Sequence, residues 1–170
     1  KIEKLRGGKV YPGHYIFQGN PGTGKTTVAR ILGNKFKELG VLSKGHFIEV
    51  KRDDLVGEYQ GHTAVKTKEV LNKALGGVLF IDEVYSLRNG AGDDFGMEAI
   101  NTIVPFIEDN RQNMIVVIAG YSQPMNEFLS TNPGLKSRFN TTIDFEDYNT
   151  DELYEIFKGV SKDFNWNETT

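Results

Sequence analysis

Cysteine is absent from the 170 residues of this chain, which excludes disulfide bonds and thiolate metal sites. Long apolar runs are absent too, since none approaches the roughly 20 residues that a membrane-spanning helix needs. No secretory signal is visible, and the chain begins at Lys1 rather than at a methionine. We therefore expect a piece of a longer cytoplasmic protein with no membrane partner.

An excess of basic residues is also lacking. The chain has 20 Lys and Arg against 23 Asp and Glu, which gives a formal net charge of −3. Nucleic-acid binding usually needs a concentrated excess of positive charge, so this balance argues against it. The length is enough for one compact domain with a sizeable core.

The most informative stretch is Gly19–Thr27, with the sequence Gly-Asn-Pro-Gly-Thr-Gly-Lys-Thr-Thr. It fits the phosphate-loop pattern Gly-x-x-x-x-Gly-Lys-Ser/Thr, and a short apolar stretch before it and a helical pattern after it supply the required context. Successive backbone N–H groups and the positive end of the following helix bind anions at such a turn. The residues that we expect to contact a bound nucleotide are Asn20, Pro21, Gly22, Thr23, Gly24, Lys25, Thr26 and Thr27.

Two acidic residues complete the predicted site. Asp82 and Glu83 directly follow the apolar run Val78–Ile81, which is typical of a central parallel strand. Asp82 could then hold Mg²⁺ together with the Thr26 hydroxyl, while Lys25 reaches the β- and γ-phosphates. Glu83 could accept a proton from an attacking water. This combination predicts hydrolysis of ATP with Mg²⁺.

Strand and helix patterns alternate along the chain, which predicts an α/β fold with a parallel sheet and right-handed crossovers. A polar lead-in spans residues 1–13, and a new helical element begins near Asn149, which forms a capping box with Glu152. The expected strands are 14–18, 46–50, 78–81, 114–119 and 139–145, and the expected helices are 25–39, 63–75 with Thr63 as N-cap, 95–110 and 123–129.

With both motifs, the chain resembles the AAA+ ATPases, and among them the CbxX/CfqX group, which includes red-type Rubisco activases and stage V sporulation protein K. The stretches that carry the resemblance are 19–27, 52–59, 61–63, 66–71, 76–83, 119–121 and 132–139. The resemblance implies a five-stranded P-loop sheet of order 5-1-4-3-2. It also implies a large nucleotide-binding subdomain over 14–148 and a helical lid that begins within 149–170.

The resemblance assigns further roles. Arg138 looks like an arginine finger, which acts in trans on the nucleotide of a neighbouring subunit. Tyr59 looks like the aromatic residue of a central pore loop that grips an unfolded polypeptide. Many AAA+ proteins have Asn at the sensor position after the fourth strand, whereas this chain has Ala119-Gly120-Tyr121-Ser122. Tyr121 and Ser122 are therefore the candidate sensors.

Three functions fit these features. The leading one is an ATP-driven, chaperone-like remodelling motor that works as a homo-oligomeric ring of six subunits and pulls on a polypeptide substrate. The second is a nucleotide-binding fragment without turnover. The third is a DNA-directed AAA+ loader, against which the acidic balance counts. A GTPase is disfavoured because no Asn-Lys-x-Asp motif is present.

Overall fold

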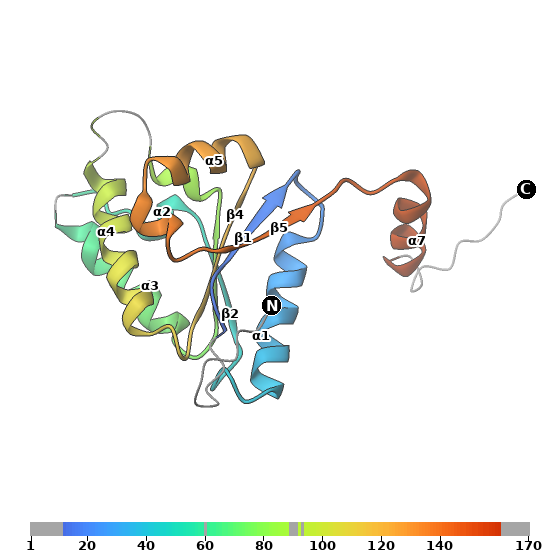
Figure 1. Ribbon diagram of the computed structural model, residues 1–170, viewed down its shortest axis with the longest axis horizontal. Coiled ribbons are helices and arrows are strands. Elements are labelled where there is room, and N and C mark those ends of the chain that lie inside the picture. The colour runs from blue at the N-terminus through green and yellow to red at the C-terminus, as the bar shows by residue number, and fades with distance from the viewer. Residues whose placement is uncertain (1–11, 60, 89–91, 93, 161–170) are drawn as a thin grey trace, which may run out of the picture.

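The computed structural model describes residues 12–59, 61–88, 92 and 94–160. A single sheet of five parallel strands runs through the centre in the order β2-β3-β4-β1-β5 (Figure 1). Read from the other edge, this is the predicted order 5-1-4-3-2, which is thereby confirmed. The strands are β1 (Tyr15–Gly19), β2 (Phe47–Val50), β3 (Val78–Asp82), β4 (Ile115–Gly120) and β5 (Thr141–Phe145).

The central strands are those with continuous apolar sequences. All six residues of β4 are buried, and so are the first four of β3. Such strands need cover on both faces, which helices on either side of the sheet supply. The edge strands β2 and β5 are only partly buried, in keeping with their mixed sequences.

Helices form unequal layers on the two faces of the sheet (Figure 1). Helix α1 (Lys25–Glu38) covers one face, where Ala29 and Phe36 pack against Phe17 and Phe80. The other face carries the larger core, beneath α2 (Arg52–Leu55), α3 (His62–Ala74), the 3₁₀ turn η1 (Val84–Leu87), α4 (Asp94–Asp109), α5 (Ser122–Ser130) and α6 (Pro133–Lys136). The four-residue elements α2, η1 and α6 were not predicted, because one turn is too short to show helical periodicity.

Helix α7 (Thr150–Val160) stands apart from the sheet (Figure 1). Its start is fixed as predicted: Asn149 Oδ1 accepts the N–H groups of Asp151 and Glu152, and the Glu152 carboxylate accepts the Asn149 N–H at 2.9 Å. Leu153 and Phe157 on this helix are both more than half exposed. In the described part of the chain, none of the helices has the length and apolar character to cross a bilayer.

A buried histidine joins β1 to its surroundings. His14 is 6% exposed, its Nδ1 accepts the Val116 N–H at 3.0 Å, and its ring lies 5.6 Å from that of Phe139. Burial lowers the pKa of His14 to about 4; a backbone hydrogen bond at Ile107 opposes this shift, and the nearby charge of Arg138 adds to it. The imidazole is therefore neutral at pH 7.

This environment predicts a pH-dependent stability. The pKa of His14 is about 4 in the folded chain and 6.5 in the unfolded chain, which therefore binds more protons between these values. Stability from the neutral ring is fully present above pH 6.5 and is lost as the pH falls toward 4. Between pH 7 and pH 5 we expect His14 to lower the free energy of unfolding by about 2 kcal/mol. Urea denaturation should show a flatter pH dependence for His14→Gln, and an equally steep one would contradict this account.

Candidate active site

The phosphate loop and the acidic pair meet at one edge of the sheet. In the parallel register, Gln18 lies opposite Gly120 and Asp82 lies opposite Ala119, so β1, β4 and β3 end together. A cavity of about 480 Å³ opens at this edge. It is lined by Gly19, Pro21, Gly22, Gly24, Lys25, Thr26, Thr27, Lys51, Phe80, Asp82, Glu83, Tyr85, Gly120 and Tyr121.

Most sequence-predicted site residues thus line one cavity, and the others lie outside it. Asn20 and Thr23 belong to the phosphate loop without lining the cavity. Thr23 is buried and donates its hydroxyl hydrogen bond to the Asn20 carbonyl at 2.8 Å. Of the two sensor candidates, Tyr121 lines the cavity and is 41% exposed, whereas Ser122, the first residue of α5, does not.

The entry into α1 requires glycine. Gly24 precedes the helix with φ of 93°, a left-handed conformation that residues with a Cβ rarely adopt. A Cβ on Gly24 would also lie 3.0 Å from the Tyr148 hydroxyl. The turn leaves the first N–H groups of α1 at the cavity, where the helix dipole favours negative charge.

Lys25 is held by the loop itself. Its Nζ donates to the carbonyl oxygens of Gly19 and Asn20, both at 2.7 Å. Burial lowers the pKa of Lys25, and the negative charge of Asp82 acts in the opposite direction. The ammonium group therefore lies within the loop, in the electrostatic field of the acidic strand end.

The acidic pair shows an unusual backbone. Asp82 ends β3 and accepts the N–H of Glu83 on one carboxylate oxygen at 3.0 Å, while the other oxygen lies 3.9 Å from Lys51 Nζ. Glu83 has φ of 49° and is, among the described residues, the one non-glycine residue with positive φ. This conformation costs about 1–2 kcal/mol and is the kind of strain that clusters at functional sites. It turns the chain directly after β3, at the rim of the cavity.

Thr26 and Asp82 offer the chemistry that Mg²⁺ prefers, namely hydroxyl and carboxylate oxygens. They come from different elements and line the same cavity. The described residues contain no group of three or more His, Asp or Glu that could hold a metal. Mg²⁺ at nucleotide sites typically takes only one or two protein carboxylates and completes its shell with phosphates and water, so the residues present fit it.

Sequence reasoning missed Tyr85 and Lys51 in the cavity wall. A Cβ on Gly120 would lie 2.4 Å from the Tyr85 ring, so the ring occupies the space that the glycine leaves at the end of β4. Burial raises the pKa of Tyr85, and the neighbouring charges of Glu83 and Asp82 raise it further. The signal for Lys51 was its place directly after β2, the strand that pairs with β3.

The segment before α7 also contacts the phosphate loop. The Asn20 side-chain amide donates to both carboxylate oxygens of Asp147 at 3.0 and 2.9 Å. The Tyr148 hydroxyl donates to the Thr23 carbonyl at 3.0 Å. Thus Asn20 and Thr23, which do not line the cavity, are the residues that join the loop to the start of α7.

Tyr59 lies in a separate surface groove. The groove has a volume of about 510 Å³ and is lined by Gly57, Glu58, Tyr59, His62, Val65, Lys66 and Glu69. Tyr59 is 66% exposed and its ring meets that of His62 edge-on at 5.6 Å. The prediction that Thr63 caps α3 was wrong: the helix begins at His62, and the buried Thr63 hydroxyl accepts the Gly57 N–H at 2.9 Å. Thr63 therefore anchors the loop at Gly57 and does not cap the start of α3.

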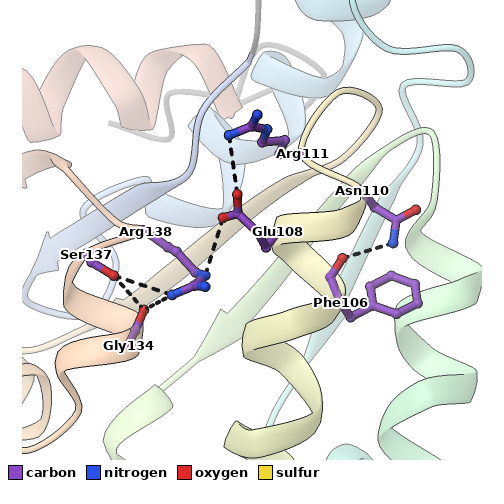
Figure 2. A network of polar contacts seen from close by, with 7 residues as sticks. All are labelled: Phe106, Glu108, Asn110, Arg111, Gly134, Ser137 and Arg138. Carbon is purple, nitrogen blue, oxygen red and sulfur yellow. Dashed lines mark hydrogen bonds and ion pairs between the residues drawn. The ribbon is translucent and has the colours of Figure 1, made fainter.

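Arg138 does not line this cavity. It follows α6, and its Nη1 donates to the Gly134 carbonyl at 2.8 Å while its Nε lies 3.5 Å from a carboxylate oxygen of Glu108 (Figure 2). The side chain is 26% exposed. The structure thus separates Arg138 from the phosphate loop, the acidic pair and Tyr121.

Comparison with known families identifies the family to which this fold belongs. A sequence model described as the ATPase family associated with various cellular activities (AAA) matches residues 15–147, from the first strand to the segment before α7. The chain belongs to the AAA family. The resemblance to AAA+ ATPases of the CbxX/CfqX group is confirmed by the relatives that follow.

Stage V sporulation protein K of Bacillus subtilis is 59% identical to this AAA chain over 145 residues, which are 85% of the chain and 45% of the relative. Protein CbbX of Cereibacter sphaeroides is 49% identical over 157 residues, 92% of the chain and 51% of the relative. The chain thus spans about half the length of these curated relatives. A crystal structure of the FIGL-1 AAA domain in complex with ADP shares the fold, with a TM-score of 0.66 at 18% identity, over 93% of the chain and 51% of that structure.

Proposed function

We propose that the chain is the motor core of an ATP-dependent, chaperone-like protein-remodelling ATPase that hydrolyses ATP to ADP and phosphate with Mg²⁺. One observation carries this proposal: Lys25 and Thr26, which open α1, line a single cavity with Asp82 and Glu83 at the end of β3. Ligands of open parallel sheets bind at the carboxyl ends of the strands, and this cavity opens there. AAA membership supports the same activity.

Each group has a distinct task in the proposed reaction. The N–H groups that open α1 bind phosphate oxygens, and Lys25 exchanges its two loop carbonyls for the β- and γ-phosphates. Thr26 and Asp82 hold Mg²⁺, which neutralises charge on the phosphates when bound. Glu83 accepts a proton from the water that attacks the γ-phosphorus, and ADP leaves as the bond to its β-phosphate oxygen breaks. Tyr121, at the cavity wall, is the proposed sensor of the γ-phosphate.

Replacing Glu83 by Gln tests the assignment of the base. The amide keeps the size of the side chain but does not accept the proton, so we expect kcat to fall by about 100-fold or more in the full-length protein. Binding of Mg-ATP should persist and should still raise the unfolding temperature. Steady-state ATPase assays and thermal unfolding measure the two effects, and a variant with the wild-type rate would refute the role of Glu83.

The proposed catalytic unit includes a second copy of the chain in a ring of six. Arg138 lies outside its own cavity, so a role at the phosphates requires a neighbouring subunit. A guanidinium there stabilises charge on the transferring phosphoryl group, an effect of about 10³–10⁵ in rate in other NTPases. Tyr59, exposed on its groove, is the proposed contact for the polypeptide substrate. In the same proposal, residues 14–148 form the nucleotide-binding subdomain and the exposed α7 begins a helical lid.

Mixing two inactive variants tests action in trans. Lys25→Ala subunits lack phosphate binding but keep Arg138, whereas Arg138→Ala subunits have a complete cavity without the finger. Each full-length variant alone should have little ATPase activity. A mixture should recover part of it, because some Arg138→Ala cavities then face an intact Arg138. Absence of recovery in mixed rings, verified by co-purification, would contradict the in-trans role.

A further inference from the structure

The guanidinium of Arg138 is held along one edge by groups of its own subunit. Nε lies 3.5 Å from Glu108 Oε2, and Nη1 donates to the Gly134 carbonyl at 2.8 Å and lies 3.4 Å from the Ser137 hydroxyl (Figure 2). Nε is buried and has no hydrogen-bond partner, so its contact with Glu108 is an ion pair at 3.5 Å rather than a hydrogen bond. Glu108 therefore provides the one charge that the buried nitrogen faces among the described residues.

Glu108 is itself oriented. Its other oxygen, Oε1, lies 3.3 Å from Arg111 Nη1, so one carboxylate spans two guanidinium groups (Figure 2). Glu108 is the second-last residue of α4, whose carboxyl end carries partial negative charge and favours a cation beside it. Helix α4 thus presents both a side chain and a helix dipole to Arg138.

The opposite edge of the guanidinium remains open. Nη2 has no hydrogen-bond or ion-pair partner in the described part of the chain, and it is not among the buried polar atoms. A guanidinium is a planar, rigid fork, so fixing Nε and Nη1 also fixes the direction of Nη2. The neighbouring His14 is neutral at pH 7 and adds no second positive charge to the site.

From this geometry we infer that Glu108 is a positioning residue for the arginine finger. It holds the Nε edge of Arg138 so that Nη2 points out of the subunit, toward the phosphates bound by a second copy of the chain. The inference rests on the proposed in-trans function and extends it to a residue on another element. In this role Glu108 touches neither the nucleotide nor the attacking water and acts on the reaction through Arg138.

Replacing Glu108 by Gln removes the charge and keeps the shape. In the full-length protein we expect kcat for ATP to fall about two- to fivefold, the range of a partly exposed ion pair, with KM unchanged. Glu108→Asp keeps the charge on a shorter side chain, so its kcat should lie between those of Glu108→Gln and the wild type. Glu38→Gln is the matched control, because Glu38 forms an exposed ion pair with Lys35 at the far end of α1; its kcat should equal that of the wild type.

A double-mutant cycle separates positioning from a merely structural role. Adding Glu108→Gln to Arg138→Ala should lower kcat no further, since the group that Glu108 positions is gone. If Arg138→Ala inactivates the protein but Glu108→Gln keeps the wild-type kcat, this inference is overturned and the proposed arginine finger stands. The inference is also overturned if Glu108→Gln lowers kcat equally in the wild type and in Arg138→Ala. The same holds if the fall in kcat is matched by a loss of thermal stability. An Arg138→Ala variant with wild-type kcat would instead overturn the proposed finger, and with it the role of Glu108.

Discussion

The parallel direction of all five strands is the constraint on which the site depends. The phosphate loop follows β1 and the acidic pair follows β3, so more than fifty residues separate Lys25 from Asp82 in the sequence. They meet because parallel strands end at the same edge of the sheet. Strand β4 lies between β1 and β3 and ends in Gly120. A side chain at this position would collide with Tyr85, so the glycine leaves room for the Tyr85 ring in the cavity wall.

Polar groups of the phosphate loop are bonded by other residues of the same chain. Lys25 binds two loop carbonyls, and Asp147 and Tyr148 bind the loop from the segment that leads into α7. These contacts join the phosphate loop to the segment that leads into α7, whose apolar residues Leu153 and Phe157 are exposed. Arg138 is tied to the end of α4, on the face of the sheet opposite to the one that α1 covers.

Local sequence patterns predicted the fold because each carries a strong physical signal. Buried parallel strands such as β4 need unbroken apolar runs, and a phosphate loop needs glycine at positive φ before its helix. The cavity also gathers Lys25, Thr26, Asp82 and Glu83, as those motifs indicated, although their roles remain predictions. One-turn elements such as α2 and α6 were missed, since four residues show no period.

Contacts made only by the tertiary fold could not be predicted. Glu108 and Arg138 lie thirty positions apart on elements with no pairing signal, and Glu108 reads in the sequence as an ordinary charge near a helix end. Tyr85 lines the cavity because of where η1 packs, which no motif records. The Asn20–Asp147 contact joins residues from opposite ends of the chain for the same reason.

The proposed activity requires that Mg-ATP binds in the cavity between Lys25 and the acidic pair. Thermal unfolding of the chain at increasing concentrations of Mg-ATP tests this binding most directly. A ligand that binds only the folded state adds about 2.7 kcal/mol of stability at a concentration of 100 times Kd. The account predicts that the unfolding temperature rises with Mg-ATP for the wild-type chain and stays constant for Lys25→Ala. No rise for the wild type, or an equal rise for both, would contradict it.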